Sequence, residues 1–372
     1  MARIPLARPS LGSEEVEAVS AVLDSGRLVS GPRVEAFEKA VREKVGAPHA
    51  VAFHSGTAAL WATLRCLDVG PGDEVIVPAL TFPATAEAVI FNGAVPVPAD
   101  VDPDSFNLDH RDVALRMTGR TKAVIAVDQF GVPADYPSIE SVLERHPDVT
   151  LVEDGACSLG SSLDSRPCGT FGEAAILSFH PRKIVTTGEG GMVLTDHDGL
   201  AGSLRSLRSH GQDASGAFSL PGLNLRMGEM EGALGQVQMG RLDDLIGRRR
   251  ALAEVYERHL PGGVTLQKIA PTADVNWQTL AALLPAGTGV RARDAFLEAM
   301  RSRSIEVGIA SFALPALPAY RDFSRDPAEY PGAMRVHESG IALPLFPDMR
   351  VEDVEEVAAA VREVLENGGD GS

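Results

Sequence analysis

The 372-residue chain is 44% hydrophobic, so it can bury a large core, and its length favours two domains over one. It carries 34 Lys and Arg against 51 Asp and Glu, a net charge of −17, which argues against a general binder of nucleic acid or anionic membranes. Three cysteines, Cys66, Cys157 and Cys168, show no paired spacing, so we expect neither a disulfide framework nor a metal site.

The N-terminus lacks the apolar core of a signal peptide. Apolar runs such as 123–127 are far too short to span a bilayer. We therefore expect a soluble, cytoplasmic protein that does not enter membranes.

The order of predicted elements indicates an α/β fold. Helical patterns at 13–24 and 34–45 open the chain, and from about residue 48 short β-branched runs alternate with helical patterns. The predicted strands are 50–54, 73–78, 95–99, 123–127 and 150–153, with helices at 57–66 and 85–91. Such alternation predicts a mostly parallel sheet covered by helices on both faces.

The C-terminal third has a different rhythm. A charged stretch, 241–260, predicts a long helix that ends at Pro261-Gly262-Gly263, and short strands then mix with helices at 290–303 and from Val351. We therefore expect a large α/β domain over 31–250 and a smaller α+β domain over 251–372. The segment 1–30 is expected to join the small domain or the active site.

Ligands of open parallel sheets bind outside the carboxyl ends of the strands, so the residues that follow each strand are the candidates. Ser55-Gly56-Thr57-Ala58 leads from the first strand into a helix. The N–H groups and dipole of a helix start attract an anion, Gly56 permits close approach, and Thr57 adds a hydroxyl. The segment is a candidate phosphate cradle, although an ordinary helix cap has the same composition.

Two further strands end in suitable side chains. Phe82 follows the strand 73–78 and could stack on a flat ring, although a core phenylalanine is the commoner case. Asp154 ends the strand 150–153 and could pair with a protonated pyridine nitrogen, or simply cap a helix or form a surface ion pair.

A lysine completes the set. Ser178-Phe179-His180-Pro181-Arg182-Lys183 precedes the glycine-rich Thr186-Thr187-Gly188-Glu189-Gly190-Gly191. A lysine in such a loop can serve as a Schiff-base amine, whereas a single surface lysine before a turn is the simpler alternative. Phosphate cradle, stacking ring, nitrogen partner and amine nevertheless follow one another at the strand ends of one sheet, a combination that chance rarely produces.

The chain resembles the DegT-type sugar aminotransferases, which are pyridoxal-phosphate (PLP) enzymes of fold type I, over nearly its full length. The most specific match is the stretch 178–191 just quoted. Other matching motifs are Ile4-Pro5-Leu6-Ala7-Arg8-Pro9, Ser30-Gly31-Pro32, residues 55–60 and 81–85, Gly222-Leu223-Asn224-Leu225-Arg226-Met227 and Leu343-Pro344-Leu345-Phe346-Pro347.

The resemblance implies a role for each candidate. Lys183 is the Schiff-base lysine, Asp154 the partner of the pyridinium, and Phe82 the stacking residue. The implied phosphate contacts are Gly56, Thr57, Ala58, Ser178 and, from a neighbouring subunit, Asn224, which makes the protein a homodimer with shared sites. The implied contacts to substrate or amino donor are Ser30, Glu189 and Arg226.

The sequence departs from the family pattern at two places. Cys157 stands where the family usually has Gln or His near the phenolic oxygen of the cofactor, and a thiol is the weaker hydrogen-bonding group. Gly228-Glu229-Met230-Glu231 stands where a small hydroxyl residue and a Gln are usual.

The implied reaction moves an amino group from glutamate or glutamine to a keto-sugar, most often one attached to a nucleoside diphosphate. Three alternatives stay open. They are transfer to a keto-cyclitol or other non-nucleotide acceptor, a PLP-dependent sugar dehydratase, and a non-catalytic PLP-binding regulator. Dehydratases of this fold carry His in place of the lysine, so Lys183 argues against that class.

Overall fold

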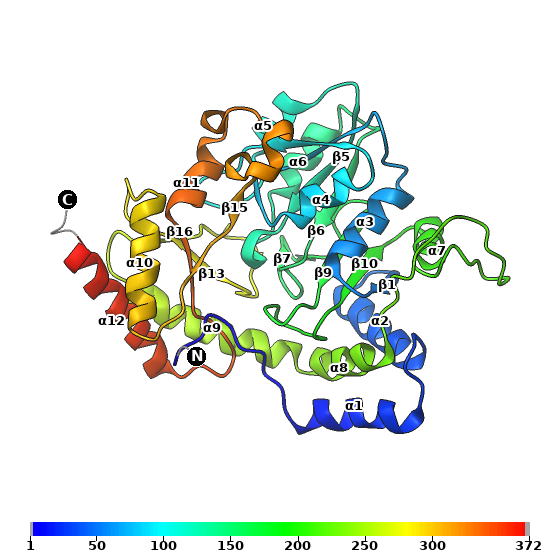
Figure 1. The fold of residues 1–372 in the computed structure, drawn as a ribbon, viewed down its shortest axis with the longest axis horizontal. Helices are drawn as coiled ribbons and strands as arrows, with labels where there is room; N and C mark the ends of the chain where they lie inside the picture. The colour runs from blue at the N-terminus through cyan, green and yellow to red at the C-terminus, as the bar shows by residue number, and fades with distance from the viewer. Residues whose placement is uncertain (1–2, 369–372) are drawn as a thin grey trace.

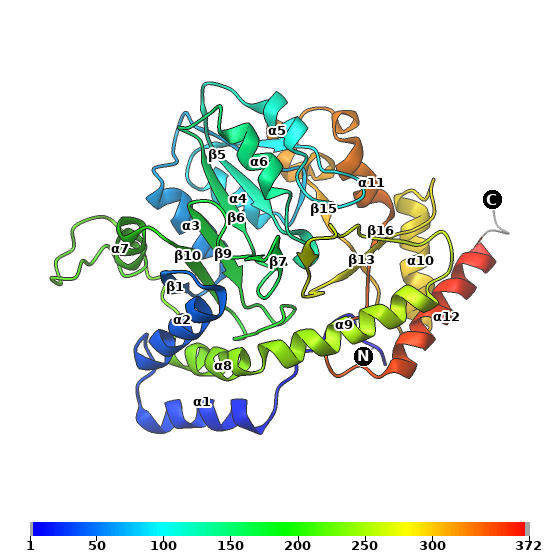
Figure 2. The same ribbon diagram turned by 180° about the vertical axis from the view of Figure 1, so that it is seen from behind.

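The computed structural model describes residues 3–368, and Figures 1 and 2 show it from opposite sides. Its centre is a seven-stranded sheet with the order β1-β10-β9-β6-β5-β2-β4. The strands are β1 (His49–Phe53), β2 (Glu74–Pro78), β4 (Val95–Ala99), β5 (Thr121–Val127), β6 (Thr150–Asp154), β9 (Ala174–Ser178) and β10 (Gly191–Thr195). Neighbours from β4 to β9 are parallel, and β10 is antiparallel to both of its neighbours. The predicted α/β fold with a mostly parallel sheet is confirmed.

Helices cover both faces of this sheet because alternate residues of each strand point to opposite sides. Val51 and Val193 pack beneath α3 (Gly56–Cys66), α4 (Ala84–Ile90) and α7 (Asp198–Leu207). Ala52 and Met192 face α2 (Pro32–Val45), α8 (Glu229–Gly240) and the start of α9 (Leu242–His259). Further along the second face, Val124 packs with residues of α5 (His110–Arg116) and α6 (Tyr136–Leu143).

A second, antiparallel sheet has the order β11-β13-β16-β14. Its strands are β11 (Thr265–Leu266), β13 (Leu280–Leu283), β14 (Gly308–Ile309) and β16 (Gly340–Leu343). Nearby lie α10 (Val290–Ser302), α11 (Pro331–Ser339) and α12 (Val351–Gly368). Two small sheets are formed by β12 (Ala273–Asp274), β7 (Ser162–Leu163) and β8 (Arg166–Pro167), and by β15 (Phe312–Ala313) and β3 (Leu80–Thr81).

The long helix α9 runs through the predicted boundary at residue 250. Leu245 belongs to the core under the large sheet, whereas Tyr256 belongs to the core of the antiparallel sheet. Ile4 lies in that second core and bridges to Ile305. The N-terminal segment then crosses to α1 (Ser13–Ser25), which packs along α8 (Figure 2). The division into domains stays a prediction. Among residues 3–368, no helix combines the length and the apolar character that a membrane span needs.

Glu229 shows why the segment that departs from the family pattern matters to the fold. Its side chain is 3% exposed and accepts the backbone N–H groups of Arg33 (3.0 Å) and Val34 (3.1 Å), at the start of α2. A carboxylate at a helix start satisfies free N–H groups and complements the helix dipole. Glu229 thereby joins the first turns of α8 and α2 beside Ser30.

The Glu229→Ala variant is expected to lower the free energy of unfolding by about 2 kcal/mol, because it leaves charge-assisted hydrogen bonds unmade. Urea denaturation of the cofactor-free protein measures the change. Glu43→Ala, which removes an exposed carboxylate near the other end of α2, serves as the control and should cost less than about 0.5 kcal/mol. Equal losses in the two variants would contradict this role of Glu229.

Candidate active site

The first turn of α3 meets the ends of two strands. Ser55 caps the helix, since its Oγ accepts the backbone N–H of Ala58 at 3.1 Å. A Cβ at Gly191, where β10 begins, would lie 2.3 Å from the carbonyl oxygen of Ser55, and one at Gly56 would lie 3.1 Å from the Cβ of Ser178. The backbones approach so closely that this corner requires glycine at Gly191. Thr57 is exposed and Gly56 and Ser178 are half-buried, so the helix start is open to a ligand.

Asp154 ends β6 and is 7% exposed. Its Oδ2 accepts the hydroxyl of Thr85 at 3.0 Å, and its Oδ1 accepts the backbone N–H of Ala156 at 3.3 Å. Thr81 in turn lies 2.9 Å from the Thr85 hydroxyl. Burial raises the pKa of the Asp154 carboxyl, and the hydrogen bond from Thr85 opposes that shift.

Lys183 lies beside Cys157. The Lys183 Nζ donates to the Cys157 Sγ at 3.0 Å, and the backbone N–H of Lys183 donates to the carbonyl oxygen of His180 at 2.8 Å. Cys157 follows β6 and Lys183 follows β9, and these two strands are parallel neighbours in the sheet. The positive charge of Lys183 also opposes the rise that burial causes in the pKa of Asp154, so the amine, the thiol and the carboxylate share one site.

Phe82 and Ala58 have different environments. Phe82 stands between β3 and α4 and its side chain is 66% exposed, which excludes the alternative that it is a core residue. Ala58 is buried in the first turn of α3, so only its backbone could face a ligand.

The four remaining candidates differ in exposure. Ser30 and Arg226 are half-buried, and Glu189 and Asn224 are exposed. Asn224 bridges to Ser209 at the base of the long segment between α7 and α8, which extends away from the rest of the molecule in Figure 1. Within residues 3–368, none of these four side chains forms a hydrogen bond with Lys183, Asp154 or Cys157. Their roles stay predictions.

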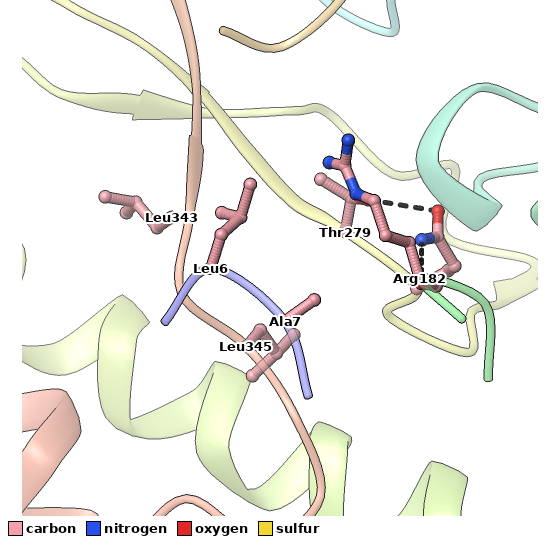
Figure 3. Close-up of a pocket in the computed structure, with 7 residues that line it drawn as sticks. Leu6, Ala7, Arg182, Thr279, Leu343 and Leu345 are labelled. Carbon is pink, nitrogen blue, oxygen red and sulfur yellow. Dashed lines mark hydrogen bonds between the residues drawn. The ribbon is translucent and has the colours of Figure 1, made fainter. Parts of the chain in front are cut away.

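A small pocket lies next to the lysine loop (Figure 3). Leu6 and Ala7 of the N-terminal segment, with Leu343 and Leu345, form one side of it, and Arg182 and Thr279 lie on the other. The Nε2 of Gln278 donates to the carbonyl oxygen of Arg182 at 2.8 Å. The N-terminal segment and the strand β16 with the residues after it therefore meet next to Arg182, which directly precedes Lys183.

Sequence reasoning missed several residues of this region. Thr85 lies within the matching motif 81–85, and the spacing of four residues between its hydroxyl and that of Thr81 is the signal that could have identified it. Asp128 follows β5 just as Asp154 ends β6, yet it is fully buried, with its carboxylate bound by Ser158, Tyr136 and the backbone of Ala134. Nothing in the local sequence marks Asn276 and Gln278.

The residues present fit PLP. The open start of α3 can accept a phosphate through backbone N–H groups, and a buried carboxylate with a raised pKa favours a cationic partner such as a pyridinium. An amine stands within reach of the same site.

Comparisons with known proteins identify the fold and the family. The DegT/DnrJ/EryC1/StrS aminotransferase family matches residues 9–362. The spore coat polysaccharide biosynthesis protein SpsC of Bacillus subtilis (strain 168) is 34% identical over 380 residues, which are 97% of this chain and 97% of that protein.

Solved structures agree over 98% of the chain. Spr1654 of Streptococcus pneumoniae in its PMP form superposes with a TM-score of 0.94 at 28% identity, covering 98% of this chain and 100% of that one. DesV of S. venezuelae gives a TM-score of 0.91 at 33% identity over 98% of each chain. PseC of Helicobacter pylori, an aminotransferase of pseudoaminic acid biosynthesis, gives 0.92 at 28% identity over 98% of this chain and 99% of that one.

Spr1654 has also been solved in a PLP form, with the same TM-score of 0.94. The expected fold type I architecture and the expected cofactor are confirmed. The chain belongs to the DegT/DnrJ/EryC1/StrS aminotransferase family and is a PLP-dependent aminotransferase.

Proposed function

We propose that this enzyme transfers the amino group of glutamate or glutamine to a keto-sugar that is attached to a nucleoside diphosphate, with Lys183 as its catalytic amine. The observation that carries the assignment is the Lys183 Nζ at 3.0 Å from Cys157, in the same site as the buried carboxylate of Asp154. The sugar is supported by the relatives, since SpsC is named for polysaccharide and PseC for pseudoaminic acid biosynthesis.

The first turn of α3 and Ser178 would hold the phosphate, Asp154 would face the ring nitrogen, and Phe82 would cover the ring. When bound, PLP supplies an electron sink for the charge that develops on the amino-bearing carbon. Asp154 would keep the ring nitrogen protonated, because a buried carboxylate favours a positive partner.

Lys183 carries the proton. With the cofactor bound, its amine would accept the proton released from the amino-bearing carbon of the donor, and it would give a proton back when the acceptor is aminated. Cys157 stands against the amine and limits the positions that the lysine side chain can take.

A homodimer with shared sites is part of the proposal. Asn224, which would reach the phosphate of the partner subunit, is exposed on its own chain. In the same long segment the side chains of Phe218 and Leu223 are 71% and 49% exposed, as expected for residues that a second subunit covers.

Two measurements test the function. The absorbance spectrum of the PLP-loaded protein should convert to that of the pyridoxamine form when glutamate or glutamine is added. UDP or dTDP alone should then inhibit transfer to a nucleotide-linked keto-sugar competitively. No conversion with either donor would contradict an aminotransfer from them, and no inhibition by nucleotides would favour a cyclitol or other non-nucleotide acceptor.

The Gly191→Ala variant tests the phosphate cradle. The added Cβ would lie 2.3 Å from the Ser55 carbonyl oxygen and 2.5 Å from the Gly56 nitrogen, so the start of α3 must move. We expect the Kd for PLP to rise about tenfold or more, the equivalent of about 1.4 kcal/mol. Fluorescence titration of the cofactor-free protein measures it. Gly199→Ala, whose Cβ meets nothing within 4 Å, is the matched control, and equal affinities in the two variants would contradict the assignment.

A further inference from the structure

One short segment, Asn276–Thr279, forms hydrogen bonds with the backbone of Cys157 and with the backbone of Arg182, the residue before Lys183. We propose that Asn276, Gln278 and Arg249 form a clamp that positions Lys183 against Cys157. The three are positioning residues, since none of them needs to touch the cofactor. The proposal rests on the proposed function of Lys183.

The segment is held in a strained conformation. Trp277 has φ of 53°, in the left-handed region that bulky aromatic residues rarely adopt. Such a conformation persists only where the surrounding contacts determine it, and strain of this kind gathers at functional sites. The contacts on either side of Trp277 show what holds it.

Asn276 holds the cysteine side. It is fully buried, and its Nδ2 donates to the carbonyl oxygens of Cys157 at 2.8 Å and Leu159 at 3.0 Å. Its Oδ1 accepts the backbone N–H of Gln278 at 2.9 Å. A Cβ at Gly131 would lie 2.1 Å from that Oδ1, so glycine leaves the room that the Asn276 side chain occupies.

Gln278 holds the lysine side. Its Nε2 donates at 2.8 Å to the carbonyl oxygen of Arg182, in the peptide unit that joins Arg182 to Lys183. Its Oε1 accepts the Thr279 hydroxyl at 3.0 Å, which fixes the orientation of the amide. The two side chains of one segment therefore bind the carbonyl oxygen of Cys157 itself and the one directly before Lys183.

Arg249 fixes the segment from α9. Its Nη1 donates to the carbonyl oxygens of Trp277 (3.1 Å), Gln278 (3.1 Å) and Leu345 (3.0 Å). The residue is 3% exposed, and burial lowers the pKa of its guanidinium to about 10. Within residues 3–368 it has no carboxylate in ion-pair range, and its Nε has no hydrogen-bond partner.

A buried guanidinium without a counter-ion is unfavourable for folding. The presence of Arg249 is explained if the carbonyl groups that it orients must be held in place for the Lys183 site to have its correct geometry. Leu345 adds to this account, because its backbone N–H donates to Leu6 at 3.2 Å and both residues line the pocket beside Arg182.

The test is the rate at which cofactor-free protein captures PLP, followed by stopped-flow growth of the visible absorbance. Gln278→Met removes the hydrogen-bond donor to Arg182 at nearly constant side-chain volume. Arg249→Met removes the guanidinium that binds the carbonyl oxygens of Trp277 and Gln278. Because small misplacements of a reacting group are costly, we expect both variants to capture PLP about tenfold more slowly. We also expect both to lower kcat rather than raise KM.

Arg293→Met is the matched control. Arg293 is another buried arginine of the C-terminal part, 5% exposed, and it donates to the carbonyl oxygen of His337, away from the lysine loop. Arg293→Met should lower the unfolding midpoint without slowing capture. Gln278→Met, which removes no charge, keeps the test open if Arg249→Met does not fold.

The outcomes separate the two proposals. The clamp alone would be overturned if the Gln278→Met variant captured PLP as fast as the wild type. It would also be overturned if the Arg293→Met control captured PLP as slowly as the clamp variants. A wild-type protein that forms no visible band with PLP would overturn the role of Lys183 and the clamp with it.

Discussion

The Lys183→Ala variant is expected to lose amino transfer almost completely. The amine that moves the proton is gone, and a positioned general base contributes about 10²- to 10⁴-fold to a rate. The visible band of the PLP-loaded protein should disappear as well, because alanine cannot bond to the cofactor. Single-turnover mixing with glutamate or glutamine, followed by absorbance, measures both effects in one experiment.

Lys39→Ala is the matched control, because it removes an exposed lysine of α2 whose side chain is 63% exposed. It should leave the spectrum and the rate unchanged. A Lys183→Ala protein that keeps the wild-type band would show that another amine holds the cofactor, and the proposed function would need a different lysine.

The Asp154→Asn variant is expected to change activity and stability in opposite directions. The amide cannot keep the ring nitrogen protonated, so we expect kcat to fall about 10²- to 10³-fold, the size of effect seen when one preorganised electrostatic group is removed. The cofactor-free variant should be more stable at pH 7 than the wild type, by about 1 kcal/mol, because it no longer buries an unpaired charge.

The raised pKa of Asp154 determines how the difference in stability between the wild type and Asp154→Asn depends on pH. Burial raises the pKa of Asp154 above its unfolded value of 3.8, so between these two values the folded state binds more protons than the unfolded state. The stability that protonated Asp154 contributes is therefore complete below the unfolded pKa and is lost as pH rises through the folded pKa. Asp154→Asn does not titrate, so its advantage over the wild type should be largest at neutral pH and shrink toward pH 4.

Thermal unfolding of both cofactor-free proteins across this pH range measures the difference. Thr85→Val, which removes the hydroxyl that donates to Asp154, is a useful companion, because it should raise the pKa of the carboxyl further. A constant difference between wild type and Asp154→Asn at all pH values would contradict the raised pKa. Unchanged kcat would contradict the assigned role.

Much of the site could be predicted from sequence because its parts are local. Ser55 through Ala58 is a strand-to-helix turn whose chemistry lies in adjacent residues, Asp154 ends a β-rich run, and Lys183 stands shortly after another. The rule that parallel strands present their carboxyl ends at one edge then places these residues together. The same local periodicity predicted five strands of the large sheet, β1, β2, β4, β5 and β6, and the helices α1 to α4, α9, α10 and α12. It did not include β9, the antiparallel β10 or the helices α5 to α8 and α11.

Only the tertiary structure decided the contacts that join distant segments. Nothing near Cys157 in sequence indicates that its thiol contacts the Lys183 amine. Nothing near Asn276 or Gln278 indicates that their side chains bind the carbonyl oxygens of Cys157 and Arg182. The same is true of Glu229, which caps a helix that begins almost two hundred residues earlier. Periodicity reports which face of an element is buried, but the partner of a buried polar group depends on how the elements pack, and only the folded chain fixes that.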